Sequence, residues 1–340
     1  MDPSQRTVVA VDLGGTKIRS LVVDGLGRIK GVDQRPTDAR EGKEHVIGHI
    51  VQSVQAACGA CGIDVRQVEA IGVDVPGPVD FERGILLDAP NLPGWQNVAL
   101  GPILTERLGP RSCLENDANA AAVGEHRFGA GRGTRHMLYL TVSTGIGGGI
   151  IIDGKLYRGA DGTAGELGHI VVDPAGPQHN CGMTGCLEVM SSGTAIARMA
   201  QEAVRAGRSP MLAEAVRDGM LSSKEVSDAA HAGDAAAQEI LATAARYLGF
   251  GLANYINIFN PEVFVIGGGA SQIFDLLIQP AWDSARSMAW ERPARRARLE
   301  RAALGGDSGA LGMAALALDL VAGDAIDRAA ASAGLAGSSR

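Results

Sequence analysis

Four potential metal ligands gather in one short stretch of the sequence, which reads His169, His179, Cys181 and Cys186. Imidazole nitrogens and thiolate sulfurs are the ligands that zinc takes in tetrahedral protein sites. The Cys-x4-Cys spacing differs from that of the common zinc fingers, so two packing thiols and two surface histidines remain an alternative. The clustering favours a zinc site over that alternative.

Two glycine-rich turns follow apolar, β-branched runs and could bind phosphate. Asp12–Lys17 (DLGGTK) follows one such run, and Ser143–Gly149 (STGIGGG) follows another. Glycines at these corners let backbone N–H groups approach a phosphate closely, and the threonine hydroxyls add donors. The first turn lacks the P-loop spacing. A third run, Gly267–Gly269, follows VFVI, and a plain strand-to-helix turn explains it equally well. Together the three glycine runs suit a nucleotide held between two similar domains.

Asp117 follows a short apolar strand, Ser112–Leu114, and stands at the start of an alanine-rich helix, Ala118–Phe128. Aspartate in this position commonly caps the helix N-terminus. It could instead act as a general base, with Asn116 beside it to orient a hydroxyl substrate. Local chemistry alone favours the cap.

The elements around these motifs predict an α/β fold with a repeated plan. A strand–turn–strand pattern occurs near the start of the chain and again at Met137–Ile152, which indicates two related units. Apolar residues at helical spacing predict helices farther on. The predicted strands are Thr7–Leu13, Thr16–Val23, Arg28–Gln34, Glu69–Val75 and Val263–Ile266, and the predicted helices are Glu44–Ala57, Thr194–Ala206, Pro210–Arg217, Ala235–Ile258 and Ser308–Ala322.

Composition narrows the class of protein. The chain has 340 residues and a formal net charge of −7, which disfavours a general nucleic-acid-binding surface. It has no apolar run long enough for a membrane helix and no secretory signal, so we expect a cytoplasmic protein without membrane partners. Five cysteines in such a chain argue against disulfides, and we interpret Cys58, Cys61 and Cys113 as packing thiols.

The ordered set of motifs resembles the ROK group of repressors, open reading frames and sugar kinases. The matching stretches lie between about Val8 and Ala314: DLGGTKI, PGPVD, NLPGW, LENDANAAAVGE, TGIGGGI, GELGH, CGMTGCLE, NPEVFVIGGG and LGGDSGALGMAAL. The resemblance implies an actin-like (ribonuclease H-like) ATPase fold, with two α/β domains and an interdomain cleft. It places a smaller domain at 1–117, completed by a helix at about 308–325, and a larger domain at 118–307 with a zinc loop at 165–193.

The resemblance also implies a role for individual residues in ATP-dependent phosphorylation of a hexose, foremost glucose. Asp117 corresponds to the catalytic base and Asp12 to a carboxylate on the Mg²⁺ side. The expected sugar-binding residues are Asn91, Asn116, Glu166, His169 and Glu188, and those expected to bind ATP and its phosphates are Asp12, Gly14, Gly15, Thr16, Lys17, Thr144, Gly145, Gly267 and Gly268.

The zinc loop departs from the family pattern, because His179 stands where a first cysteine is usual. A structural His₂Cys₂ zinc site of His169, His179, Cys181 and Cys186 is nevertheless chemically reasonable. Repressors of the group carry an N-terminal helix-turn-helix domain for which we see no room. The alternatives left open are kinases for N-acetylmannosamine, N-acetylglucosamine or fructose and, less favoured, a polyphosphate donor or a non-catalytic sugar sensor. The resemblance predicts a homodimer or homotetramer.

Overall fold

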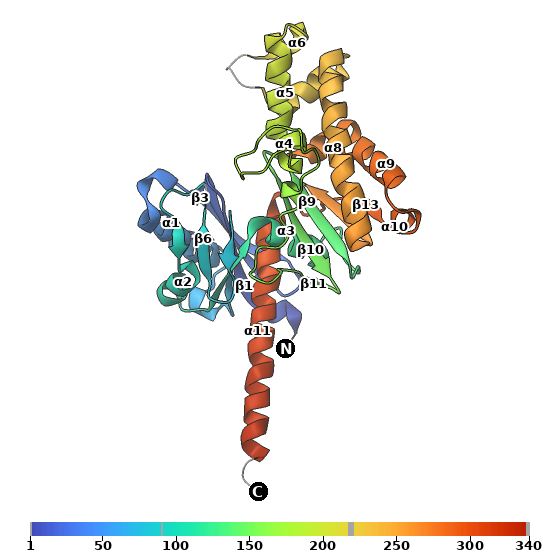
Figure 1. Cartoon of the computed structure of the whole chain (residues 1–340). Coiled ribbons are helices and arrows are strands. Elements are labelled where there is room, and N and C mark those ends of the chain that lie inside the picture. Colours follow the sequence, from blue (N-terminus) through green and yellow to red (C-terminus); the bar gives the residue numbers. More distant parts are fainter. Residues whose placement is uncertain (1, 90, 217–220, 338–340) are drawn as a thin grey trace. The chain divides into compact units, whose positions relative to one another are not determined.

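The computed structural model describes residues 2–89, 91–216 and 221–337, and these fall into two compact units. Unit 1 comprises the described residues of Met1–Arg132, Arg158–Ala164 and Gly306–Arg340. Unit 2 comprises those of Gly133–Tyr157 and Gly165–Gly305. Figure 1 shows their elements in the colours of the sequence.

Unit 1 is built on a five-stranded sheet in the order β3-β2-β1-β4-β8. The first three predicted strands correspond to β1, β2 and β3, which form an antiparallel meander, whereas β4 and β8 run parallel to β1. Their β-branched residues fill the buried positions, as expected for a sheet covered on both faces. The strands are β1 (Thr7–Leu13), β2 (Lys17–Asp24), β3 (Ile29–Pro36), β4 (Ile71–Val75) and β8 (Ser112–Asn116).

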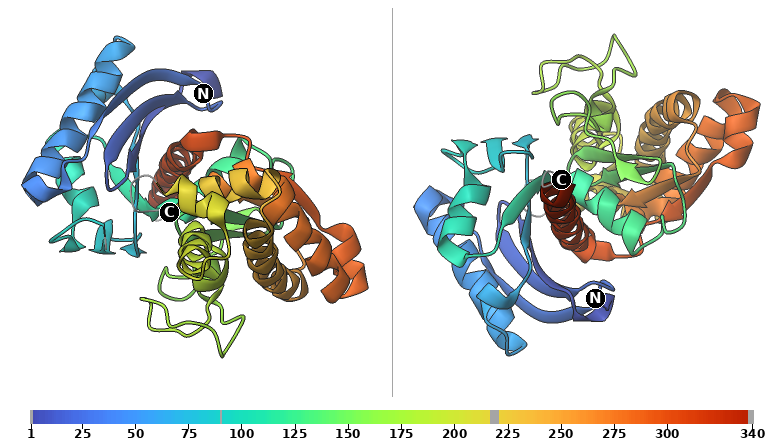
Figure 2. Two further views of the ribbon diagram at one scale, coloured as in Figure 1. Left: turned by 90° about the horizontal axis from the view of Figure 1, so that it is seen from above. Right: turned by 90° about the horizontal axis from the view of Figure 1, so that it is seen from below.

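Helices cover both faces of this sheet, as Figure 2 shows for α1 and α11. The apolar face of α1 packs into one core with β1, β2 and β4, and α11 lies on the other face, where it also contacts α3. A small three-stranded sheet adjoins them. The elements are α1 (Lys43–Ala60), α2 (Leu100–Leu108), α3 (Asp117–Arg127), α11 (Ser308–Gly337), β5 (Val79–Asp80), β6 (Ile85–Asp88) and β7 (Gln96–Val98), with short 3₁₀ turns such as η2 (Ala39–Glu41).

Unit 2 repeats the plan with a sheet in the order β11-β10-β9-β12-β13. Again three antiparallel strands are extended by two parallel ones. This matching order confirms the repeated plan that the two strand–turn–strand patterns predicted. The strands are β9 (Met137–Val142), β10 (Ile146–Ile152), β11 (Lys155–Leu156), β12 (Val263–Gly267) and β13 (Arg298–Arg301).

Seven helices among the described residues of unit 2 form its second layer (Figure 1). The long helix α8 packs against α9, and Trp282 of α9 meets Phe264 of β12 with ring centroids 5.4 Å apart. The helices are α4 (Leu187–Ser191), α5 (Gly193–Arg205), α6 (Pro210–Ala215), α7 (Ser223–His231), α8 (Ala235–Phe259), α9 (Gln279–Met288) and α10 (Glu291–Arg296), with η4 (Leu167–His169), η5 (Gly269–Ile273) and the π-turn η6 (Phe274–Ile278). Arg217, predicted to end a helix, lies outside the described residues.

Two expectations about thiols and membranes can be compared with these elements. All five cysteines are free, and Cys58 is buried at the end of α1, where burial raises its pKa to about 11. Such a thiol stays protonated, as a packing residue should.

Within the described part of the chain, no helix is both long enough and apolar enough to span a bilayer.

Candidate active site and metal centre

Asp117 is the first residue of α3, but it does not cap the helix. Asn116 is the N-cap, and its side-chain oxygen accepts the N–H groups of Ala118 at 3.0 Å and Asn119 at 3.2 Å. The Asp117 carboxylate is exposed, with one oxygen 2.8 Å from the Ala118 nitrogen. The capping role therefore belongs to the neighbouring amide, and the carboxylate of Asp117 is accessible to a substrate.

A buried ion pair that the sequence motifs did not indicate lies directly behind this helix start. The Glu115 side chain is 1% exposed and accepts the Arg158 Nε–H at 2.7 Å. It also accepts Asn119 Nδ2–H at 3.1 Å, and the Arg158 guanidinium lies 4.5 Å from the centre of the Phe81 ring. The ion pair connects the segment of residues 158–164 to the end of β8, directly before Asp117. The sequence signal for this ion pair was the charged Glu115 at the end of the short strand SCLE.

The first phosphate turn is held from behind by the segment that follows β3. Gly14 N–H donates to the Lys17 carbonyl at 3.0 Å and closes the turn. Thr37 is fully buried; its hydroxyl donates to the Gly14 carbonyl at 2.6 Å and its N–H to the Thr16 carbonyl at 3.0 Å. A Cβ placed on Gly15 would lie 3.3 Å from the Asn91 Cβ, so Asn91 lies against this turn.

The carboxylates of Asp12 and Asp74 lie side by side where β1 enters the first phosphate turn. Asp12 of β1 is in register with Asp74 of β4, and partners in register on neighbouring strands share a face of the sheet. Asp74 is 1% exposed, and neither of its oxygens has a hydrogen-bond donor among the described residues. Burial, with Asp12 and Asp117 nearby, raises the pKa of Asp74 well above its ordinary value. Burial also raises the pKa of Asp12, opposed by Lys17. Asp74, the more deeply buried of the two, is therefore the carboxyl group whose protonated form the fold favours more strongly.

In unit 2 the second phosphate turn borders a cavity of about 470 Å³. The Thr144 carbonyl accepts the Thr194 hydroxyl at 2.8 Å, and Gly193 N–H donates to the Ser143 carbonyl at 2.8 Å. Gly269, which follows the predicted pair Gly267 and Gly268, lines the same cavity. The lining of the cavity is mainly apolar. Its polar lining residues include Thr144, Thr194, Arg198, Gln201 and Ser222. Such a space suits a flat heterocycle with a polar tail.

Glu188 joins the second phosphate turn to the predicted zinc loop. One carboxylate oxygen accepts the Ile146 N–H at 2.6 Å, and the other lies 3.3 Å from His179 Nε2. A Cβ on Gly145 would collide with this carboxylate, so a side chain at this position would displace Glu188 from the turn. The sequence motifs predicted Glu188 as a sugar ligand and gave no indication of these two contacts.

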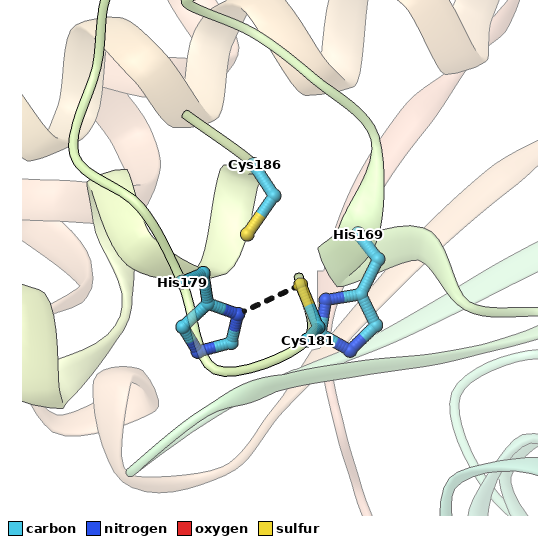
Figure 3. Close-up of side chains that lie close together, drawn as sticks. All are labelled: His169, His179, Cys181 and Cys186. Carbon is cyan, nitrogen blue, oxygen red and sulfur yellow. Dashed lines mark hydrogen bonds between the residues drawn. The ribbon is translucent and has the colours of Figure 1, made fainter. Parts of the chain in front are cut away.

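The four predicted metal ligands do gather in the structure (Figure 3). The ligand atoms of His169, His179, Cys181 and Cys186 all lie within 4.8 Å of one another. His179 Nδ1 is 3.0 Å from the Cys181 sulfur. His169 Nδ1 is buried without a hydrogen-bond partner among the described residues, and it faces the Cys181 sulfur in Figure 3. A buried, unpartnered ring nitrogen beside two sulfurs fits a zinc ion as its missing partner.

Both histidines turn their second nitrogen toward a carboxylate. His179 Nε2 lies 3.3 Å from Glu188, and His169 Nε2 lies 3.8 Å from Glu166. Zinc-bound imidazoles commonly use their free N–H in this way, which fixes the ring orientation. The set thus has the donor types, the spacing and the outer partners of a closed structural zinc site.

The predicted residues divide between the two units. Each group is coherent by itself: one unit holds an exposed carboxylate beside a glycine turn, and the other holds a glycine turn, a cavity and the His/Cys group. Unit 1 carries Asp12, Gly14, Gly15, Thr16, Lys17, Asn91, Asn116 and Asp117, and unit 2 carries Thr144, Gly145, Glu166, His169, His179, Cys181, Cys186, Glu188, Gly267 and Gly268.

Comparison with known proteins identifies the family of this chain. The model of the ROK family matches residues 8–320. The chain belongs to the ROK family. A glucokinase from Thermotoga maritima is 41% identical over 274 residues, which cover 80% of this chain and 85% of that protein. A xylose repressor from Caldicellulosiruptor bescii is 31% identical over 273 residues, covering 80% of this chain and 68% of the repressor.

A solved ROK structure confirms the fold class. The ROK family glucokinase from Streptomyces griseus, in complex with glucose and AMPPNP, is 39% identical and superimposes with a TM-score of 0.76. The match covers 92% of this chain and 99% of that one. The predicted actin-like fold of two α/β domains is therefore confirmed for this ROK protein.

Proposed function

We propose that this ROK protein is an ATP-dependent hexose kinase, with glucose as its foremost substrate. The observation that carries the proposal is the exposed carboxylate of Asp117, at the start of a helix that Asn116 caps, in a chain similar to glucokinases over most of its length. A glycine-rich turn for phosphates in each unit supports it.

Asp117 acts as the general base. It accepts the proton of the sugar hydroxyl as the hydroxyl oxygen attacks the γ-phosphorus of ATP, while the bond from that phosphorus to the β–γ bridging oxygen breaks and ADP leaves. The neighbouring Asn116 uses its side-chain oxygen on the helix N-terminus and donates its Nδ2–H to the Gly77 carbonyl at 3.3 Å, so its amide is held in a fixed orientation. The set of sugar ligands is completed by Asn91, Glu166, His169 and Glu188, and positioning contributes much of the rate.

Backbone N–H groups of the two glycine turns hold the phosphates, with the hydroxyls of Thr16 and Thr144 as further donors. The cavity beside Thr144 accommodates the adenosine moiety. Asp12 lies at the end of the first turn, and a carboxylate there fits the oxygen ligands that Mg²⁺ prefers. Magnesium bound to ATP neutralises phosphate charge, and Asp12 would hold it on that side.

Zinc in the His₂Cys₂ group plays a structural part, because all four positions are filled by protein side chains. The ion would fix the loop from Glu166 to Glu188. It would thereby hold Glu188 against the Ile146 N–H in the second phosphate turn.

An Asp117→Asn variant tests the base directly. We expect kcat to fall by about 10²–10⁴-fold while the Kd for glucose changes little, because the amide keeps the shape but cannot accept the proton. Steady-state kinetics with a coupled ADP assay and calorimetric glucose binding would measure the two effects. Asp228→Asn, on the exposed face of α7, is a matched control. Turnover by Asp117→Asn close to that of the control would rule out Asp117 as the base.

The choice of sugar needs a separate measurement. ATP consumption would be compared across glucose, fructose, N-acetylglucosamine and N-acetylmannosamine, at equal concentrations. We expect the largest kcat/KM with glucose. A larger value with an acetylated amino sugar would reassign the substrate but keep the kinase, and no turnover with any sugar would favour the alternative of a non-catalytic sugar sensor.

A further inference from the structure

A second group of potential metal ligands lies in unit 1, on and before helix α1. The ligand atoms of Asp38, His45 and His49 lie within 4.8 Å of one another. His45 and His49 are four residues apart on α1, so their side chains leave the same face of the helix. Their ring centroids are 4.2 Å apart. Asp38 is not part of α1 but immediately precedes η2, and its carboxylate lies close to both imidazole rings.

The hydrogen bonding of His49 leaves one nitrogen available for a metal. His49 Nδ1 lies 3.0 Å from the Pro36 carbonyl oxygen. A carbonyl only accepts hydrogen bonds, so Nδ1 carries the proton of the neutral ring and Nε2 keeps its lone pair. A backbone carbonyl that orients the non-ligating nitrogen is a common support for metal-binding histidines.

The Asp38 carboxylate is not committed elsewhere. Its nearest charged partner is His45 Nε2 at 3.9 Å, which is too long for a hydrogen bond. Among the described residues it makes no ion pair with lysine or arginine. The distance instead resembles the separation of two ligands on either side of one ion. Asp38 also has a left-handed backbone, with φ 50°, which directs the chain back toward α1.

We propose that Asp38, His45 and His49 bind a divalent transition-metal ion such as zinc, at a site separate from the His₂Cys₂ group. Two imidazole nitrogens and one carboxylate oxygen suit zinc, nickel or copper better than magnesium or calcium, which prefer oxygen ligands. Three protein ligands leave at least one coordination position for water, so the ion binds more weakly and more reversibly than in a closed four-ligand site.

An ion bound at this site is expected to restrain the first phosphate turn of unit 1. Thr37 immediately precedes Asp38 and makes both hydrogen bonds to the first phosphate turn, at Gly14 and Thr16. An ion that joins Asp38 to α1 therefore restrains the segment on which that turn rests. Occupancy should protect the backbone amides of residues 37–49 from exchange.

Metal titration of the full chain tests the site. The protein is first loaded with one zinc per chain, freed of excess metal, and then titrated with zinc chloride in a calorimeter. We expect a second, weaker equivalent that is lost in both His45→Asn and His49→Asn, while the first equivalent and the circular dichroism spectrum are unchanged. His231→Asn is the matched control, because His231 is an exposed helical histidine whose Nε2 lies 3.1 Å from Asp275 and whose Nδ1 lies 2.9 Å from the Ser227 carbonyl oxygen. It should keep both equivalents.

Cobalt distinguishes this site from adventitious binding at thiols. The His₂Cys₂ group should give thiolate-to-cobalt charge-transfer bands, whereas a second cobalt on histidines and a carboxylate should add d–d bands without them. Hydrogen exchange should show protection at residues 37–49 in the wild-type protein and not in His49→Asn. The proposal is overturned if the wild-type protein takes no second equivalent, if the second equivalent survives in both histidine variants, or if it carries thiolate bands.

Discussion

Because of the buried acid pair Asp12 and Asp74, the free energy of unfolding of unit 1 should depend on pH. The sign of this dependence should be opposite to that given by an ordinary ion-paired carboxylate. Asp74 is enclosed by β1, β4 and β8 and faces the carboxylates of Asp12 and Asp117. Lys17 and Arg19 act on Asp12, and Glu115, in register on β8, already has Arg158. The first turn of α11 approaches Asp74 at Gly309, which has no side chain, and among the described residues no cation contributes to the pKa of Asp74.

The sign follows from the proton balance. Asp74 has a folded-state pKa raised above its unfolded value, so between those two values the folded chain holds a proton that the unfolded chain has released. The free energy of unfolding then falls as pH rises, by about 1.4 kcal/mol per pH unit for one proton. The stabilisation is complete below the unfolded pKa of about 4 and is lost as pH rises toward the folded pKa.

An Asp74→Asn variant removes this titration but keeps the size of the side chain and a donor for Asp12. We expect it to gain stability relative to the wild-type protein as pH rises above the unfolded pKa of about 4, with a slope difference approaching 1.4 kcal/mol per unit until the folded pKa is reached. Urea unfolding at several pH values would measure it, with amide exchange in β4 to report on unit 1. Asp64→Asn is the control, because a lowered pKa of about 2 gives no slope in this range. Equal slopes for Asp74→Asn and the wild-type protein would refute a protonated Asp74.

Three further predictions concern the elements around the site. Arg158→Met should destabilise the protein by roughly 2–4 kcal/mol in urea unfolding, because it leaves the buried Glu115 without its partner, and Arg158→Lys should lose less. Gly145→Ala should raise the KM for ATP and lower kcat while zinc content stays constant, because its methyl group collides with Glu188. Cys186→Ser should lower zinc affinity at least tenfold, measured by competition with a chelator, and retention of wild-type affinity would remove Cys186 from the ligand set.

The sequence predicted most of the elements that carry the site, because their signals are local. A β-branched run that stops at glycines, as at Leu13, needs no distant partner to be recognised, and the four zinc ligands lie within eighteen residues of one another. The small β5–β7 sheet and helices such as α2 and α7 were missed, because their segments are short, with two to four residues in each strand and nine in each of these helices. The acid pair could not be predicted, since it depends on β1 and β4 lying in register across about sixty residues of chain.

The contacts of Glu188 show why a residue can match a family motif and still have a further role that its motif does not reveal. Its position after Cys186 fits a sugar ligand, yet its carboxylate also spans from His179 to the Ile146 N–H. A histidine bound to zinc through Nδ1 has its Nε2 protonated, which strengthens the contact with the carboxylate. In the proposed zinc site, histidine in place of the cysteine expected at position 179 would therefore do more than keep a ligand. It would add a hydrogen-bond donor that a cysteine ligand lacks, and this donor would restrain Glu188 against the turn expected to hold phosphate.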